Sequence, residues 1–480
     1  MTFDELVNLV SLKDPAERPQ VRIDSRLVKD GDIFAAIKGT AYDGHDFIEQ
    51  AVSSGAKYIV SQQDVDCKGA EVIVVGDSAK AAAVLAQASR GKPASKLTSL
   101  AVTGTNGKTT VGFLVRSVFQ NAGEKCGLIG TVVYDTGAKM SDASLTTPDC
   151  LLIAEMADEM VRAGSKYMVI EASSHALFQN RLAGIDFKAA AFTNLAGDHL
   201  DYHKTEKDYL AAKSLLFENL SGDATAVLNK QSAHAEKIAK KTRAKILWYA
   251  IDEPADIIAH IESMDITGTV FVLEYGGQKE KVKTFLSGRF NVSNHLAGAG
   301  LCLAAGVDLA RTAAGLSALE AVPGRLEKVQ WDGDFSVFID YAHTDDALKN
   351  VLATLKPLCE GRLTVVFGCG GDRDRSKRPR MGRVAEDLAD LVVVTSDNPR
   401  SEQPEFIIGE IITGFKNPIA DKIIVESDRK KAIELAIKNA EKNDIVLIAG
   451  KGHETYQIIG KQKFDFSDKD AALECLEKQK

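Results

Sequence analysis

The sequence predicts an α/β protein of three domains: a small N-terminal α/β domain, a central parallel-sheet domain and a C-terminal Rossmann-like α/β domain. Three observations support this fold class. The 480 residues exceed what a single hydrophobic core organises. Short apolar runs of the strand type alternate with helical stretches, which is typical of a parallel sheet covered by helices. The composition, 45% hydrophobic and 26% charged, is that of a globular protein.

The pattern of elements divides the chain at two places. The segment RGKPAS at 90–95 has the composition of a linker, and the turn Pro323-Gly324-Arg325 closes the second block. We therefore place the domains at residues 1–94, 95–325 and 326–480. Helices are expected at 47–54 and 111–121, among others. The expected strands are 32–37, 58–61, 71–75, 98–102, 168–170, 189–193, 226–228, 246–249, 337–340, 363–367, 391–395, 422–425 and 445–449.

Charge, cysteine usage and hydropathy exclude several classes of protein. The net charge of −8 gives no general attraction to nucleic acid or to anionic membranes. The seven cysteines lie far apart without a C-x-x-C pair, so we expect reduced thiols rather than disulfides or a zinc site. No apolar run is long enough to span a membrane, and the first residues lack the basic segment of a secretory signal. We expect a cytoplasmic monomer that binds no nucleic acid and does not insert into membranes.

The segment TGTNGKTT at 103–110 connects the strand at 98–102 to a helix. Its glycines permit a tight turn that points backbone N–H groups at phosphate oxygens, and the start of the helix adds positive charge. Lys108 is then placed to reach the β- and γ-phosphates, and the Thr109 hydroxyl to bind Mg²⁺. The generic G-x-x-x-x-G-K-[ST] spacing requires glycine at position 102, where this chain has Val102. The strand–loop–helix context nevertheless predicts a central domain of the P-loop ATPase type that binds ATP or GTP.

Polar clusters follow the next two strands of the same block. EASSH stands at 171–175, and NLAGDHLDYH at 194–203 contains Asp198, His199, Asp201 and His203. Ligands bind at the carboxyl ends of parallel strands in open α/β sheets, so Glu171 and His199 are candidate Mg²⁺ ligands. For each of these residues, a hydrogen-bonded position in a loop is an equally good interpretation.

Other polar residues surround these clusters. Lys213 lies in YLAAKS, where its neighbours predict a buried helix face. A buried ammonium group costs desolvation free energy, and a snorkelling side chain is the alternative interpretation. The hydroxyls of TTPD at 146–149 and the side chains of Gln179 and Arg181 suit a phosphorylated or carboxylated substrate.

The strands of the third block are also followed by polar clusters. DYAH starts at Asp340, GCGGDRDRSKRP spans 368–379, SDNPR spans 396–400 and GKGHE spans 450–454. A carboxylate at a strand end commonly binds a ribose hydroxyl. The basic run at 372–383 suits a γ-phosphate, a carboxylate substrate or a nucleic-acid backbone, and a solvated charged surface is the plain alternative. Because such clusters end strands in two domains, we expect a cleft between these domains.

These motifs, in this order, resemble those of the Mur ligases, the ATP-dependent amide-forming enzymes of peptidoglycan precursor synthesis. The resemblance covers essentially the whole chain, from DSR at 24–26 through the phosphate loop to GKGHE. DNPR is typical of the branch that adds meso-diaminopimelate, whose second carboxylate suits the guanidinium of Arg400. The chain departs from the family pattern at Asp345, where proline is usual, and at His295, where an apolar residue is usual.

The resemblance implies a role for each motif residue. Catalysis would depend on Lys108, His199 and Lys213, with Lys213 converted by CO₂ into a carbamate. Mg²⁺ would be bound by Thr109, Glu171, His199 and that carbamate. The residues implied for ATP are Gly104, Thr105, Asn106, Gly107, Lys108, Thr109, Thr110, Asn291, Asn294, Arg325 and Asp340. Those implied for the UDP-muramoyl dipeptide are Ser25, Thr146, Thr147, Ser173, Gln179 and Arg181. Those implied for diaminopimelate are Arg373, Asp397, Asn398, Pro399, Arg400, Gly450 and Glu454.

The implied reaction joins meso-diaminopimelate to UDP-N-acetylmuramoyl-L-alanyl-D-glutamate at the expense of ATP. The three domains would bind the UDP-sugar, ATP and the amino acid, in chain order. The D-glutamate carboxylate would take the γ-phosphoryl group, and the amine would then displace phosphate. Four alternatives remain open at this stage. They are the same ligation with L-lysine, a folylpolyglutamate-synthetase-like ligase, a nucleic-acid-stimulated P-loop ATPase and a non-catalytic nucleotide-binding switch.

Overall fold

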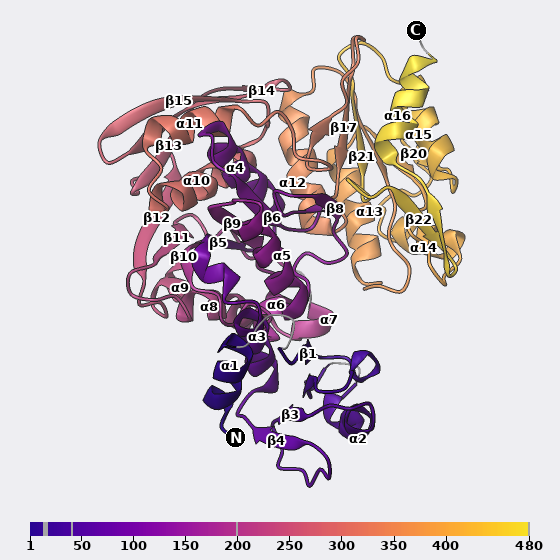
Figure 1. Cartoon of the computed structure of the whole chain (residues 1–480). Helices are drawn as coiled ribbons and strands as arrows, with labels where there is room; N and C mark the ends of the chain where they lie inside the picture. Colours follow the sequence, from indigo (N-terminus) through magenta and orange to yellow (C-terminus); the bar gives the residue numbers. More distant parts are fainter. Residues whose placement is uncertain (13–17, 40–41, 198–199, 479–480) are drawn as a thin grey trace.

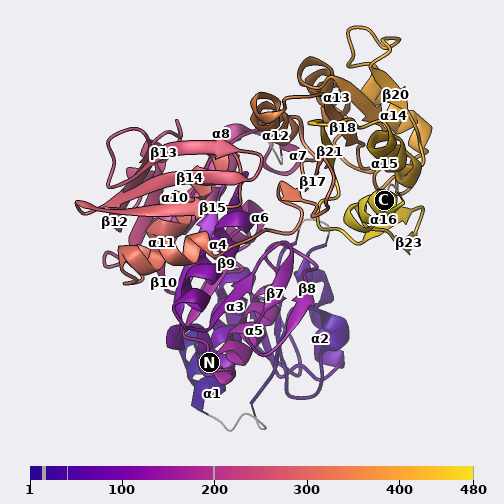
Figure 2. The ribbon, with the colours of Figure 1, turned by 90° about the horizontal axis from the view of Figure 1, so that it is seen from above.

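The computed structural model describes residues 1–12, 18–39, 42–197 and 200–478. It consists of three α/β lobes, with the N-terminal lobe in indigo and the C-terminal lobe in orange and yellow (Figure 1). The view from above shows the same three lobes, with the end of the chain in the C-terminal one (Figure 2). The three-domain α/β fold expected from the sequence is confirmed.

The N-terminal domain is built on a parallel sheet with the strand order β1-β2-β3-β4. Side chains alternate between the two faces of a strand, so Ile33 and Ala35 enter one core while Phe34 enters another. Its elements are α1 (Phe3–Leu12), β1 (Val21–Arg22), η1 (Ser25–Leu27), β2 (Ile33–Ala35), η2 (Gly44–Phe47), α2 (Ile48–Ser53), β3 (Tyr58–Ser61), β4 (Glu71–Val74) and α3 (Ser78–Ser89), followed by η3 (Pro93–Lys96).

The central domain contains a sheet with the order β15-β14-β13-β12-β11-β10-β5-β9-β6-β7-β8. Leu100 and Val102 of β5 pack into one core with helices α4 and α10, and Ala101 packs into another with α5 and α8. The elements are β5 (Thr98–Thr103), α4 (Lys108–Asn121), β6 (Cys126–Ile129), β7 (Val133–Asp135), β8 (Met140–Asp142), α5 (Cys150–Arg162), β9 (Tyr167–Glu171), α6 (Ser174–Phe178), β10 (Phe187–Phe192), α7 (Leu200–His203), α8 (Glu206–Glu218), β11 (Thr225–Asn229), α9 (Ala235–Ala239), β12 (Lys245–Ile251), β13 (Ile257–Asp265), β14 (Gly268–Tyr275), β15 (Gln278–Thr284), α10 (Arg289–Ala304) and α11 (Leu309–Ser317).

The central sheet is larger than the sequence pattern predicted. Six neighbouring strands in the middle of the sheet, in the order β12-β11-β10-β5-β9-β6, are parallel, as expected. The structure adds β7 and β8 at one edge, where β6, β7 and β8 pair antiparallel. At the other edge it adds the meander β13-β14-β15, which is antiparallel within itself and joins β12 through a parallel pairing of β13. The expected parallel sheet therefore forms the middle of the central domain, and the antiparallel strands at its edges are additions that the sequence pattern did not predict.

The C-terminal domain contains a sheet with the order β16-β17-β21-β18-β19-β20, parallel except for β16, and a separate hairpin β22-β23. The helices of the described chain include none that is both long and apolar enough for a membrane span. The elements are β16 (Glu327–Lys328), β17 (Ser336–Asp340), α12 (Asp345–Leu355), η4 (Lys356–Leu358), β18 (Leu363–Phe367), α13 (Lys377–Leu388), β19 (Leu391–Val394), α14 (Pro404–Ile412), β20 (Ile423–Val425), α15 (Arg429–Lys438), β21 (Ile445–Ala449), β22 (Tyr456–Ile459), β23 (Gln462–Asp465) and α16 (Asp468–Glu477).

Candidate active site

The loop between β5 and α4 has the backbone of a phosphate-binding loop. Gly104 has a φ of +152° and Gly107 a φ of +90°. A Cβ atom on Gly104 would lie 1.9 Å from Thr193 Oγ1, and one on Gly107 would lie 2.2 Å from Asn294 Oδ1. Both positions therefore require glycine, for conformation and for space. Val102, the departure from the generic motif, is a buried strand residue, so the loop itself begins after it.

Two lysines meet at this loop. Lys108 Nζ donates to the carbonyl oxygens of Gly104 and Thr105, both at 2.8 Å. Lys213 Nζ, on α8, donates to the same Gly104 carbonyl at 2.9 Å and lies 4.3 Å from the ring centroid of Tyr209. The Lys213 residue is only 1% exposed, so the snorkelling interpretation is wrong.

A fully buried carboxylate, Glu171, ends β9 beside the loop. It accepts hydrogen bonds from the hydroxyls of Thr109 at 3.0 Å and Thr131 at 2.8 Å, and from the backbone N–H of Thr131 at 3.0 Å. A Cβ on Gly130 would lie 2.1 Å from Glu171 Oε1. Sequence reasoning missed Thr131, although a Gly-Thr pair at the end of a strand was a usable signal.

The residues predicted to bind Mg²⁺ are only partly described. Within the described chain, His, Cys, Asp and Glu side chains form no group of three or more that could hold a metal ion. Glu171 and Thr109 nevertheless fit Mg²⁺, because this ion usually takes one or two protein carboxylates and completes its shell with hydroxyl, water and phosphate oxygens. Asp198 and His199 lie outside the described residues, as does the side chain of Asp201. His203 Nε2 shares a hydrogen bond with Ser174 Oγ, 2.9 Å away.

The residues predicted to bind the nucleotide lie around the same loop. Asn291 and Asn294 share one face of α10, and their side chains are hydrogen-bonded at 3.2 Å. Arg325 Nη2 donates to Thr109 Oγ1 at 3.2 Å. Asp340 accepts the backbone N–H groups of Leu326 and Ala342, and burial raises its pKa to about 6 against the opposing effects of Arg325 and these two N–H groups.

The residues predicted for the UDP-muramoyl dipeptide form a connected network in the central domain. Thr147 is buried and accepts a hydrogen bond from the backbone N–H of Ser173 at 3.0 Å. Arg181 donates to the Thr147 carbonyl at 2.7 Å and to Gln179 Oε1 at 2.7 Å. Thr146 joins the network through the Thr131 hydroxyl at 3.1 Å.

Ser25, the remaining residue of this predicted set, lies in the N-terminal domain. Its hydroxyl is buried there and donates to Gln50 Oε1 at 2.9 Å. The N-terminal domain contacts the central one through Asp77, which accepts a hydrogen bond from the Asn180 amide at 2.8 Å.

The residues predicted for diaminopimelate gather at the carboxyl ends of β19 and β21. Asn398 Nδ2 donates to Glu454 Oε2 at 2.9 Å. Gly450 lies so close to Asp397 that a Cβ would be 2.7 Å from Asp397 Oδ2. Arg400, after Pro399, has a φ of +52° and donates from Nη1 to the Gly371 carbonyl at 2.8 Å. Arg373 is exposed and donates to the Asp372 carbonyl. Its side chain passes Gly370, where a Cβ would lie 3.8 Å from Arg373 Cγ and 2.9 Å from Arg400 Nη1.

The central and C-terminal domains are in contact between the phosphate loop and the residues predicted for diaminopimelate. Asn106 Nδ2 in the phosphate loop donates to Asp346 of α12 at 3.2 Å. The Arg325 guanidinium lies 4.7 Å from the Tyr341 ring centroid, and the His453 ring lies 5.2 Å from the same ring. Burial and then Arg325 lower the pKa of His453 to about 4, so its ring is neutral at pH 7. The GKGHE motif therefore approaches the phosphate loop from the C-terminal domain.

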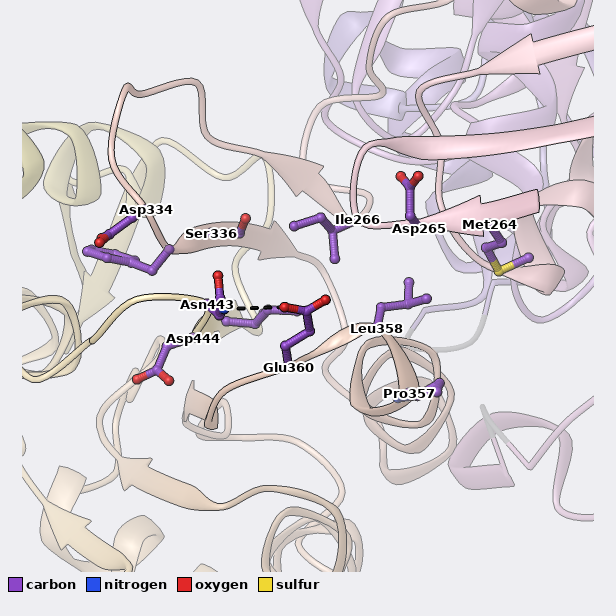
Figure 3. Close-up of a pocket in the computed structure, with 12 residues that line it drawn as sticks. Met264, Asp265, Ile266, Asp334, Ser336, Pro357, Leu358, Glu360, Asn443 and Asp444 are labelled. Carbon is purple, nitrogen blue, oxygen red and sulfur yellow. Dashed lines mark hydrogen bonds between the residues drawn. The ribbon is translucent and has the colours of Figure 1, made fainter.

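One cavity between these domains, of about 350 Å³, lies elsewhere (Figure 3). It is lined by the β13–β14 turn and by Ser336 and Ile445, the first residues of β17 and β21. Asn443 and Glu360 are hydrogen-bonded at its wall. The polar clusters stand at the carboxyl ends of these strands, so this cavity is at the opposite edge of the sheet and is not the cleft expected from the sequence.

These features define a class of protein. A phosphate loop and a buried carboxylate lie at the strand ends of one largely parallel sheet. An arginine–asparagine–glutamate cluster lies at the strand ends of a second sheet, in a domain that contacts the loop through Asp346. This arrangement is that of a multidomain P-loop ligase. Family models place the chain more narrowly. They match the Mur ligase family, catalytic domain at residues 19–94, the Mur ligase middle domain at 102–302 and the Mur ligase, glutamate ligase domain at 324–452. The chain belongs to the Mur ligase family.

Individual relatives agree with this assignment. The chain is 44% identical over 462 residues to a UDP-N-acetylmuramoyl-L-alanyl-D-glutamate--2,6-diaminopimelate ligase of Bacillus licheniformis, covering 95% of this chain and 94% of the relative. A solved structure of a ligase with that name has a TM-score of 0.70 and 32% identity, covering 100% of this chain and 99% of that one. A folylpolyglutamate synthase of Mycobacterium tuberculosis shares the fold at 19% identity and a TM-score of 0.64, covering 76% of this chain and 91% of that one.

Proposed function

We propose that this protein is an ATP-dependent carboxylate–amine ligase of peptidoglycan precursor synthesis. It joins meso-diaminopimelate to UDP-N-acetylmuramoyl-L-alanyl-D-glutamate. The observation that carries the proposal is that the Arg400–Asn398–Glu454 cluster lies in the domain that contacts the phosphate loop through Asp346. Similarity to relatives that bear this name, over nearly the whole chain, supports the choice of substrates.

The chemistry follows from the weakness of a free carboxylate as an acyl donor. The D-glutamate carboxylate oxygen attacks the γ-phosphorus of ATP, the bond to the β-phosphate oxygen breaks, and acyl phosphate and ADP form. The amine of diaminopimelate then attacks the acyl carbon, loses a proton and expels phosphate. Lys108 and the N–H groups at the start of α4 hold the phosphates and stabilise the charge on the transferring group.

The cofactor requirements are part of this proposal. Mg²⁺ would be held by Thr109 and Glu171, together with His199 and a carbamate on Lys213. When bound, the ion supplies positive charge beside the phosphoryl oxygens. Carbamate formation would replace a buried ammonium group by an anion, which suits the burial of Lys213 next to a cation site.

Substrate recognition divides between two clusters. The hydrogen-bonded network of the central domain would bind the muramoyl dipeptide through Thr146, Thr147, Ser173, Gln179 and Arg181. Ser25, in the N-terminal domain, would bind the uridine end of the same substrate. The Arg400 guanidinium would pair with the second carboxylate of diaminopimelate, and Asp397 and Glu454 would attract its ammonium group. Charge-assisted pairs of this kind select a zwitterionic end over the bare ammonium end of lysine.

Phosphate release by the purified protein tests the proposal. We expect release from ATP only with both the UDP-muramoyl dipeptide and diaminopimelate, and much less with L-lysine. Arg400→Lys should raise the KM for diaminopimelate at least about tenfold and leave the KM for ATP nearly unchanged, because a lysine cannot form the two-pronged pair. Preferential turnover with folate plus glutamate, or with nucleic acid, would contradict the proposal.

A further inference from the structure

The side chain of Asn398 is the centre of the amino-acid cluster. Its Nδ2 donates to Glu454 Oε2 at 2.9 Å. Its Oδ1 accepts two hydrogen bonds, from Lys451 Nζ at 3.1 Å and from the backbone N–H of Ile458 at 2.9 Å. Two donors converge on the same atom, so that atom must be the amide oxygen, and the NH₂ group must point to Glu454. The orientation of Asn398 is thus set by Lys451 and by the β22–β23 hairpin.

Lys451 is fully buried behind the cluster, and a buried ammonium group requires partners. Besides Asn398, its Nζ binds Glu454 Oε2 at 3.1 Å and lies 5.6 Å from the ring centroid of Tyr456. Lys451 and Asn398 both donate to Oε2, so a ligand ammonium is expected to bind Glu454 through Oε1. Lys451 itself is 0% exposed and acts on a ligand only through these two residues.

The β22–β23 hairpin forms hydrogen bonds with the backbone of the segment 397–400. Gln457 Nε2 donates to the backbone carbonyl of Asp397 at 2.7 Å. The backbone N–H of Arg400 donates to the Ile458 carbonyl at 3.1 Å, and the Arg400 carbonyl accepts from Gly460 at 2.7 Å. These bonds hold Arg400 in its left-handed conformation, with a φ of +52°, which is uncommon for a residue with a side chain. The hairpin therefore fixes the backbone position from which the Arg400 side chain extends.

We propose that Lys451 and Gln457 are positioning residues for the diamino acid. Lys451 fixes the amide of Asn398 and the carboxylate of Glu454 before the ligand binds. Gln457 fixes the backbone of Asp397, at the start of the segment that leads to Arg400. A preformed site spares the ligand the cost of ordering these groups, so losing either residue weakens amino-acid binding selectively. The inference rests on the proposed function, because it takes the cluster to be the amino-acid site.

Gln457→Ala provides the milder test, because Gln457 is only half-buried. Removing one hydrogen bond to the Asp397 carbonyl should raise the KM for diaminopimelate about fivefold. The KM values for ATP and for the muramoyl dipeptide should change less than twofold. Gln462→Ala is the matched control, since Gln462 is an exposed glutamine on the same hairpin, and it should leave all three KM values unchanged.

Lys451→Met removes the buried cation and both of its hydrogen bonds. We expect the KM for diaminopimelate to rise more than about tenfold, again with little change in the KM for ATP. A cooperative thermal unfolding transition of each variant establishes that it is folded. If Lys451→Met does not fold, the KM values of Gln457→Ala alone test the inference.

Two results would overturn the inference. One is an unchanged KM for diaminopimelate in the folded variants, and the other is an equal rise in all three KM values, which a general loss of structure would produce. Wild-type turnover alongside either result overturns this inference alone. A wild-type protein that releases no phosphate with diaminopimelate overturns the proposed function and the inference with it.

Discussion

Lys213 has an environment that an unmodified lysine rarely occupies. Its side chain is buried on α8. The Nζ atom donates a hydrogen bond to the Gly104 carbonyl and lies over the face of the Tyr209 ring. A sequence pattern of apolar neighbours cannot distinguish this arrangement from a snorkelling side chain, because the distinction depends on α8 packing against a loop about a hundred residues away in sequence. The structure therefore establishes the burial of Lys213, and the carbamate at this position stays a prediction.

Replacing Lys213 tests the carbamate. Lys213→Ala should lose most activity, because no anion is left beside the proposed cation site. Short carboxylic acids such as acetate should restore part of the phosphate release, since they can occupy the space of the missing carbamate. Lys188→Ala, at an exposed lysine of β10, should be fully active with or without acid. Full activity of Lys213→Ala without added acid would rule the carbamate out.

His295 occupies a core position of α10 where the family pattern led us to expect an apolar residue. It is fully buried, with Nδ1 2.7 Å from the Asn291 carbonyl and its ring 5.6 Å from that of Phe271. Burial lowers its pKa from 6.5 to about 4, so the ring stays neutral at pH 7 and takes the place of the expected apolar side chain.

This burial makes stability depend on pH. The unfolded chain binds a proton at His295 below about pH 6.5 while the folded protein does not, so protonation favours unfolding and stability falls as the pH drops from 6.5 towards 4. Between about pH 7.5 and about pH 5 the loss from this residue should be about 2 kcal/mol. Denaturant unfolding at both pH values should show a smaller loss in His295→Leu than in the wild type. An equal loss in both proteins would show that His295 does not contribute.

At the scale of elements, the strand–loop–helix unit of β5 and α4 depends on the glycine at the start of the helix. Gly107→Ala should raise the KM for ATP more than about tenfold, because the new Cβ would lie 2.2 Å from Asn294 Oδ1 at a φ of +90°. Gly123→Ala is the matched control, with a φ of +79° and open space around the Cβ at the other end of α4. It should cost about 1 kcal/mol of stability and leave the KM for ATP unchanged. Equal KM values in the two variants would argue against the loop assignment.

Sequence patterns predicted the parallel strands well, since these are buried on both faces and form continuous apolar runs. The ranges 58–61, 363–367 and 445–449 coincide with β3, β18 and β21. The meander β13-β14-β15 was missed because its strands are half exposed, and β15 contributes only Val282 to the hydrophobic core. The Gly276-Gly277 pair between β14 and β15 was the available signal of a hairpin.

The site was predicted unevenly, for a similar reason. Motifs at strand ends led us to propose Glu171, Asn398 and Arg400 as site residues, because ligands bind at the carboxyl ends of parallel strands. Residues that act by holding those side chains, such as Thr131 and Gln457, carry no motif of their own. Their roles depend on contacts between elements, which spacing along the chain does not reveal.

At the scale of the whole molecule, the C-terminal domain contacts the phosphate loop directly. Asp346 accepts from Asn106 of the loop. Arg325, the last residue of the central domain, donates to Thr109 and lies 4.7 Å from the ring centroid of Tyr341 in the C-terminal domain. In the proposed function, the nucleotide therefore binds in a region that both domains line, and the amine approaches from the C-terminal domain. This arrangement suits a reaction in which an activated carboxylate passes to an amine without meeting water, because acyl phosphates hydrolyse readily.

The route of one oxygen atom tests this account most directly. The muramoyl dipeptide labelled with ¹⁸O in the D-glutamate side-chain carboxylate is incubated with the protein, ATP and diaminopimelate, and the products are analysed by mass spectrometry. If the carboxylate attacks the γ-phosphorus, each turnover places one ¹⁸O atom in the released phosphate and none in the adenine nucleotide. Unlabelled phosphate, or label recovered in AMP, would contradict the account.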